Sequence, residues 1–201
     1  MVRTTTALED PRVRQGLYHA IDCEAIRTDV MRGQSRPTGS MVPTASKSFP
    51  ALEPRALAYD PARARALLTE AGYPVGFELG LLCPNNRYVA DEKICVAIAA
   101  MLAQVNVKLK VNSMPRAQYF PKAQKLDVSM YMLGWGGATT DAIFTLQPVL
   151  HSRNDKGDGD YNWGNYSHPE FDALIDDAKG DTDPKRRQET IIKAMKFHHD
   201  N

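Results

Sequence analysis

Helical spacing of apolar residues predicts most of the secondary structure of this 201-residue chain. The clearest helix begins after Asp60, a capping residue, has Pro61 at its first position and stops at Gly72. Further helices are predicted at residues 11–20, near 89–105, and through the carboxyl-terminal third. The apolar face of the helix near 89–105 is predicted to comprise Ile94, Ile98, Met101 and Val105.

Three short apolar runs predict strands, at residues 77–83, 107–111 and 128–133. The third run is almost continuously apolar, which favours a strand covered on both faces. Strands that alternate with helices are typical of a largely parallel sheet with right-handed crossovers. We therefore predict an α/β fold in which a mainly parallel central sheet is flanked by helices and followed by a helical carboxyl-terminal third.

The carboxyl ends of parallel strands meet at one edge of a sheet, where open α/β sheets bind ligands. Residues 84–88, 113–119 and 134–141 follow the three predicted strands. Their amides, guanidinium groups and glycines suit a polar or anionic organic ligand, with a tryptophan as an apolar platform. The predicted ligand contacts are Asn85, Arg87, Arg116, Trp135, Gly136, Gly137, Ala138, Thr139, Thr140 and Asp141.

A structural role remains the alternative for each of these side chains. Trp135 would then be a core residue, and the arginines would be solvated surface. Asp141 would only cap the helix that starts at Ala142, which Pro148 should end or kink.

Charge and hydropathy exclude two classes of partner. The chain has 25 Lys and Arg against 24 Asp and Glu, and a net charge of +1 does not indicate the basic surface that binds nucleic acid. No apolar run approaches the roughly 18–20 residues of a membrane span, and the amino terminus lacks a signal pattern. We expect a soluble piece of a longer protein, because the sequence opens and closes on helices.

The three cysteines, Cys23, Cys83 and Cys95, form no CxxC pair. This favours buried or unreactive thiols, although an oxidising compartment would allow a bridge between Cys83 and Cys95.

Motifs for catalysis and metal binding are missing. Aligning Asp158 and Gly159 with an EF-hand loop places Lys156 at a ligand position and Asn165 where a glutamate belongs. No G-x-S-x-G elbow, phosphate loop or H-E-x-x-H occurs, and no nucleophile has a matched base. We predict no metal ligand, no cofactor and no catalytic residue.

Several segments together resemble the extracellular solute-binding proteins of the oligopeptide, dipeptide and nickel transport family. They are "DPRVRQGLYHAIDCEAI", "YDPARARALLTEAGYPVGFEL", "LAQVNVKLKVNSMPRAQYF", "DVSMYMLGWGG" and "YNWGNYSHPEFDALIDDA". The resemblance implies a class II periplasmic-binding-protein lobe over residues 1–201, the second lobe of a two-lobed protein. It further implies a monomeric periplasmic or extracytoplasmic component of an ABC importer, which binds a peptide or similar small organic solute between its lobes and delivers it to a membrane permease.

The chain departs from the family pattern at two positions. Peptide-binding relatives commonly carry, where Ala138 stands, an aspartate that pairs with the α-amino group of the peptide. A methyl group cannot neutralise an ammonium, so either Asp141 substitutes or the ligand has no free amine there. Arg116 stands where relatives often carry tryptophan, which favours a ligand with a carboxylate or another anionic group.

Two other functions remain open on sequence grounds. The chain would serve as the ligand-sensing domain of a transcription regulator if a DNA-binding domain preceded it. It would be a hydrolase if Asp141 and His151 acted together.

Overall fold

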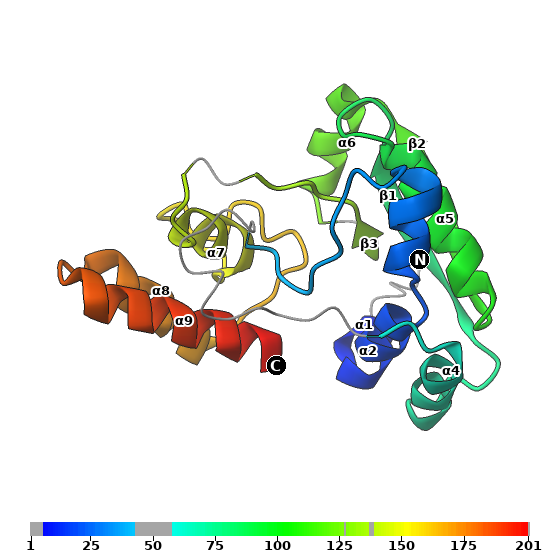
Figure 1. Ribbon diagram of the computed structural model, residues 1–201, viewed down its shortest axis with the longest axis horizontal. Helices are drawn as coiled ribbons and strands as arrows, with labels where there is room; N and C mark the ends of the chain where they lie inside the picture. Colours follow the sequence, from blue (N-terminus) through cyan, green and yellow to red (C-terminus); the bar gives the residue numbers. More distant parts are fainter. Residues whose placement is uncertain (1–5, 43–57, 127, 137–138, 201) are drawn as a thin grey trace. The chain divides into compact units, whose positions relative to one another are not determined.

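The computed structural model describes residues 6–42, 58–126, 128–136 and 139–200. The described residues fall into two compact units: those within 1–37 and 57–133 form the first, and those within 38–56 and 134–201 form the second (Figure 1). Whether both units belong to one lobe over residues 1–201 stays a prediction.

The first unit begins with short helices. They are α1 (Thr6–Glu9), α2 (Pro11–His19), α3 (Cys23–Ala25) and the π-helical turn η1 (Ile26–Val30). Helix α4 (Pro61–Glu70) follows, and the carboxylate of Asp60 caps it by accepting the amide of Arg63 at 2.8 Å. The chain leaves α4 at Gly72, which has a φ of +93°. The structure therefore confirms the predicted cap at Asp60, the proline at the first helical position and the end of the helix before Gly72.

A parallel sheet forms the centre of the first unit. Its strands are β1 (Phe77–Pro84), β2 (Val107–Met114) and β3 (Met130–Tyr131), in the order β2-β1-β3. Both pairings are parallel, which confirms the predicted topology. Helix α5 (Asp91–Ala103) connects β1 to β2 and lies along them (Figure 1), and α6 (Arg116–Ala123) connects β2 to β3.

Two details of this sheet differ from the prediction. The third strand covers only Met130 and Tyr131, and residues 128–133 are half-buried rather than covered on both faces. The reason is its position at the edge, where it pairs only with Leu81 and Leu82 among the described residues.

The buried face of α5 is also different. It carries Asp91, Cys95 and Leu102, whereas Ile94 and Ile98 are only half-buried. The helix is apolar almost all round, so spacing alone could not identify the side that faces the sheet.

The core of the first unit joins helices α2, α4 and α5 to the sheet. Its buried residues include Val13, Leu68, Leu79, Leu102 and Val107. Helices α2 and α4 approach closely at Gly16, where an added Cβ would lie 3.2 Å from the side chain of Leu68.

The second unit is helical. It contains α7 (Ile143–Leu150), α8 (Pro169–Gly180) and α9 (Pro184–Asp200), and α8 and α9 lie side by side (Figure 1). Their shared core is built at helical spacing from Leu146, Phe171, Ile175, Ile191 and Met195. The predicted helical carboxyl-terminal third is therefore confirmed.

Candidate functional site

The ends of β1 and β2 are joined by two hydrogen bonds. The amide of Asn85 donates to the carbonyl of Met114 at 3.1 Å. The amide of Arg116 donates to Oδ1 of Asn86 at 2.7 Å. The loop after β1 and the turn into α6 therefore form one connected surface at the carboxyl edge of the sheet, as predicted from the topology.

Asp91 shapes the loop after β1 from inside the protein. Its carboxylate is 4% exposed and accepts the amides of Arg87 at 2.9 Å, Tyr88 at 3.0 Å and Glu92 at 2.9 Å. Burial alone would raise the pKa of Asp91, but the hydrogen bonds outweigh burial and hold it below its ordinary value of 3.8. The buried charge thus fixes the backbone that presents Asn85 and Arg87.

A disulfide fixes the same loop at its base. Cys83, the second-last residue of β1, is bonded to Cys95 in α5, with Cα atoms 6.6 Å apart. The prediction of unreactive thiols is wrong for this pair, and the bridge that we considered as the alternative is present. Cys23 is a free, half-buried thiol whose pKa is raised by burial.

The predicted polar contacts of the first unit point outward. Asn85, Arg87 and Arg116 are exposed, and the guanidinium carbon of Arg87 lies 4.9 Å from the centre of the Tyr88 ring. Within the described part of the chain, neither guanidinium group forms an ion pair. Two cations without counter-charges at one edge suit an anionic ligand.

The predicted aromatic residue belongs to the second unit. Trp135 is half-buried, and its ring meets that of Tyr161 edge to face at 5.0 Å between centroids. Its Nε1 is buried and has no hydrogen-bond partner among the described residues. Gly136 is exposed, and no described atom lies within 4 Å of where a Cβ would stand. Gly137 and Ala138 lie outside the described residues.

Asp141 is already paired on both of its oxygens. Oδ1 accepts the amide of Ile143 at 3.0 Å, at the start of α7, and Oδ2 forms a 2.7 Å ion pair with Arg187. Its own amide donates to the hydroxyl of Thr139, and Thr139 and Thr140 are exposed. This hydrogen bond supports the predicted capping role of Asp141, although the helix begins at Ile143 rather than at Ala142. The expectation that Pro148 would end the helix is wrong, because the helix continues through it to Leu150.

The structure connects only part of the predicted site. Hydrogen bonds join the segments after β1 and β2, whereas Trp135 and Asp141 lie in the second unit. A common site for all three segments stays a prediction. Sequence reasoning missed the positioning roles of Asn86 and Asp91, although an acidic residue in the first turn of the predicted helix was a visible signal.

The catalytic pair considered from the sequence is not supported by contacts. The carboxylates that lie within 4 Å of the His151 ring nitrogens belong to Asp172 and Asp176, each at 3.6 Å. Asp141 instead contacts Ile143 and Arg187.

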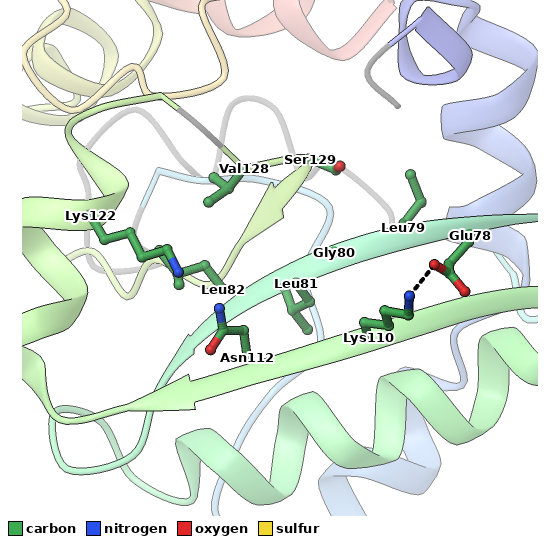
Figure 2. A pocket seen from close by; sticks show the side chains of 10 residues that line it. All are labelled: Glu78, Leu79, Gly80, Leu81, Leu82, Lys110, Asn112, Lys122, Val128 and Ser129. Atoms are coloured by element: carbon green, nitrogen blue, oxygen red, sulfur yellow. Dashed lines mark ion pairs between the residues drawn. The ribbon is translucent and has the colours of Figure 1, made fainter. Parts of the chain in front are cut away.

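A cavity of about 300 Å³ lies on the sheet of the first unit and is lined by β1 and β2 residues as far as Leu82 and Asn112. Lys122 reaches it from α6, and Glu78 is ion-paired with Lys110 at its rim (Figure 2). None of the predicted ligand contacts lines this cavity. We place the candidate site at the strand ends because the unpaired guanidinium groups and the fixed loops are there.

The chain thus combines a parallel α/β sheet that has polar, exposed strand ends with a helical unit that carries Trp135 near its start. Residues 1–157 match the family described as bacterial extracellular solute-binding proteins, family 5 Middle. The chain belongs to this family.

One relative is the glutathione-binding protein GsiB of Salmonella typhimurium, which is 31% identical over 197 residues. The match covers 96% of this chain and 38% of GsiB, so the chain spans well under half the length of this relative.

Solved structures share the fold. The dipeptide-binding protein of Pseudoalteromonas sp. SM9913, in complex with Met-Leu, is 27% identical and has a TM-score of 0.83 over 95% of this chain and 39% of that protein. The periplasmic binding protein DppA of Helicobacter pylori, in complex with the peptide STSA, has a TM-score of 0.88 at 23% identity, over 96% of this chain and 37% of DppA. The predicted fold class is confirmed.

None of the helices in the described part of the chain combines the length and the apolar character that a membrane span needs.

Proposed function

We propose that this chain is the second lobe of the substrate-binding component of an ABC importer and forms one side of a ligand cleft. The cleft would hold a short peptide or similar small organic solute and close over it, and a membrane permease would receive the solute. The family match and the glutathione- and dipeptide-binding relatives support this proposal. The protein would act as a monomer in the periplasm or another extracytoplasmic compartment.

The observation that carries the proposal is the fixed, cationic edge of the sheet. The loop after β1 is held by Asp91, by the disulfide and by the hydrogen bond from Arg116 to Asn86. This loop presents Arg87, and the start of α6, which is joined to the loop, presents Arg116; neither has a carboxylate partner among the described residues. The backbone at both residues is fixed, so a carboxylate ligand would meet two arginines whose points of attachment need not be ordered on binding.

We further propose that the ligand is anionic. Arg87 and Arg116 would pair with its carboxylates, and Asn85 would donate a hydrogen bond. Trp135 and the backbone of residues 136–140 would contact its apolar and peptide parts. Glutathione carries two carboxylates and is the ligand in the name of one relative, so it is the first compound to test.

The family is one of binding proteins, and we propose no catalytic step. Solute binding needs a fixed polar edge and a closing partner, and it needs no nucleophile.

Calorimetric titration of the intact polypeptide in which this chain occurs tests the proposal. Glutathione and neutral tripeptides would be compared on the parent protein and on Arg116→Ala. We expect roughly tenfold to hundredfold weaker binding of the anionic ligand to Arg116→Ala, the effect of losing one charge-assisted hydrogen bond. Arg153→Ala, at an exposed arginine of the second unit, is the matched control and should bind normally. Equal binding by Arg116→Ala and Arg153→Ala would remove Arg116 from the site.

A further inference from the structure

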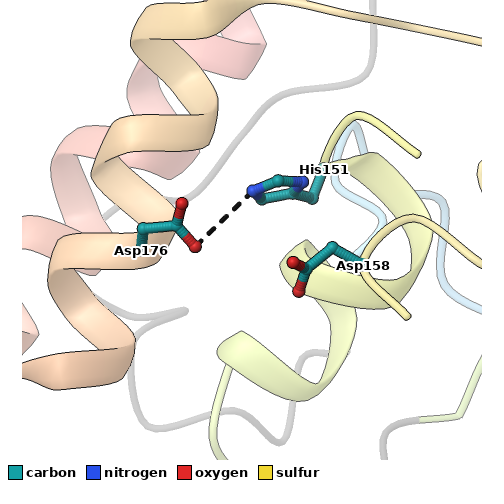
Figure 3. Close-up of side chains that lie close together, drawn as sticks. All are labelled: His151, Asp158 and Asp176. Atoms are coloured by element: carbon teal, nitrogen blue, oxygen red, sulfur yellow. Dashed lines mark ion pairs between the residues drawn. The ribbon is translucent and has the colours of Figure 1, made fainter. Parts of the chain in front are cut away.

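Three side chains of the second unit converge outside the candidate ligand site. They are His151, which directly follows α7, Asp158 in the next loop, and Asp176 on α8 (Figure 3). One ligand atom of each lies within 4.8 Å of the others. His151 and Asp158 are each 4% exposed, whereas Asp176 is at the surface. The cluster thus has a buried side and an open side.

The hydrogen bonding of His151 leaves one ring nitrogen with a lone pair. Nδ1 lies 2.7 Å from the carbonyl oxygen of Ser152, and a carbonyl only accepts, so Nδ1 carries a proton. Nε2 is buried and has no hydrogen-bond partner among the described residues. It faces Oδ1 of Asp176 at 3.6 Å (Figure 3). In a neutral ring, two electron-rich atoms therefore face each other, and a cation between them would relieve this.

The two carboxylates carry more negative charge than their surroundings neutralise. Lys179 contacts Asp158 at 2.8 Å and Asp176 at 3.2 Å, so one ammonium serves both. Asp158 also accepts hydrogen bonds from Nε2 of Gln147 at 2.6 Å and from Nδ2 of Asn154 at 2.7 Å. Its orientation is therefore fixed by neighbours, as is common for ligands of metal ions.

We propose that Nε2 of His151 and one carboxylate oxygen each of Asp158 and Asp176 bind a divalent transition-metal ion, in competition with the ammonium group of Lys179. An imidazole with two carboxylates favours Zn²⁺ or its neighbours in the first transition series over Ca²⁺ and Mg²⁺, which prefer oxygen ligands alone. The proton on Nδ1, donated to a backbone carbonyl, sets the tautomer that metal-bound histidines use.

The geometry requires a small closure of the cluster. Tetrahedral zinc with bonds of about 2.0–2.1 Å holds its ligand atoms about 3.3 Å apart. Asp176, with a side chain that is 58% exposed, is free to move inward while His151 and Asp158 stay fixed. Lys179, whose side chain is 32% exposed, can turn toward solvent, and water would complete the coordination.

Titration of the intact polypeptide with ZnCl₂, and with CoCl₂ followed by its visible absorption, tests the site. We expect Asp176→Asn to weaken Zn²⁺ binding by about tenfold to hundredfold, because a ligand is lost. Lys179→Met should tighten binding by roughly tenfold, because the competing ammonium is gone. The matched control is Asp177→Asn, at the exposed neighbour of Asp176, which should bind as the parent does.

Two results would overturn the proposal. One is the absence of measurable zinc binding at micromolar concentrations. Zinc affinity that neither Asp176→Asn nor Lys179→Met changes would count equally, because the zinc would then be bound elsewhere. The other is a nitrogen-15 spectrum of the metal-free protein at neutral pH in which both ring nitrogens of His151 carry protons. A proton, rather than a metal ion, would then lie between Nε2 and Asp176. Neither readout depends on solute binding, so this proposal and the proposed transport function fail separately.

Discussion

The amide of Arg116 donates a 2.7 Å hydrogen bond to Oδ1 of Asn86, a residue that lies 30 positions earlier in the chain. This bond joins the loops that follow two neighbouring parallel strands. It therefore sets the spacing between the residues that we propose as ligand contacts on each loop.

Replacing Asn86 tests whether this bond organises the candidate site. Asn86→Ala removes the acceptor, and we expect about three- to tenfold weaker solute binding, which corresponds to one exposed hydrogen bond. Asn86→Asp keeps an acceptor oxygen and should retain the loop geometry, although its added charge should weaken anionic ligands selectively. Calorimetry with a neutral and an anionic ligand separates the two effects. If Asn86→Ala binds both ligands normally, the bond does not position the site.

Removing the disulfide between Cys83 and Cys95 should destabilise the first unit. The bridge spans 12 positions, and closing a loop of this size stabilises a fold by roughly 3 kcal/mol. We expect the double variant Cys83→Ala, Cys95→Ala to lose free energy of unfolding of that order in urea titrations. Cys23→Ser is the control, and its stability should still fall on addition of a reductant. If a reductant leaves the free energy of unfolding of the parent protein unchanged, the bridge does not stabilise the fold.

The pKa of Asp91 predicts a stability change in acid. Because the folded-state pKa lies below 3.8, the carboxylate contributes stability that is complete above about pH 5 and is lost as the pH falls from 3.8 through the lower folded-state pKa. Asp91→Asn should lower the free energy of unfolding by about 1–2 kcal/mol at pH 7. Between pH 5 and 3 its free energy of unfolding should fall less steeply than that of the parent. Urea unfolding at several pH values measures both, with Glu92→Gln at the exposed neighbouring residue as control. Parallel pH profiles for Asp91→Asn and the parent would contradict the assignment.

Much of the fold of the first unit could be predicted because its signals are local. The helix after Asp60 carries its own cap, first-turn proline and terminal glycine, so its bounds need no tertiary information. The length of β3 could not be predicted, because it depends on how many residues reach β1 rather than on their apolar character. The bridge between Cys83 and Cys95 likewise depends on β1 and α5 packing together.

The location of the candidate site could be predicted from the sequence, but the hydrogen bonds that hold it could not. Parallel topology placed Asn85, Arg87 and Arg116 at one edge, because strand ends meet there whatever the side chains do. The contacts that hold this edge come from Asn86 and Asp91, and no periodicity identifies the partner of a single side chain.

Glycine substitutions separate steric clash from backbone strain near the start of β1. A Cβ on Gly76, which has a φ of +79°, would lie 1.8 Å from the carbonyl oxygen of Asn106, so Gly76→Ala should cost about 3 kcal/mol or more. Gly72 has a φ of +93° and open space, and Gly72→Ala should cost only about 1–2 kcal/mol. Gly80 is the unstrained control in open space. Urea titrations that rank Gly76→Ala no worse than Gly72→Ala would show that the backbone at Asn106 yields.

The pairing of Asp141 predicts how the solute is recognised. Asp141 already caps α7 through the amide of Ile143 and neutralises Arg187, so it has no unpaired charge to offer an ammonium group. We therefore expect acetylation of a peptide's amino terminus to change its affinity by well under 2 kcal/mol, since a buried amine that lost a charged partner would cost about 1.5–3 kcal/mol. Asp141→Ser keeps a capping oxygen and tests the same point from the protein side. If acetylated peptides and Asp141→Ser both bind more than about tenfold more weakly, Asp141 exchanges Arg187 for the amine of the ligand, and the solute is recognised through that amine.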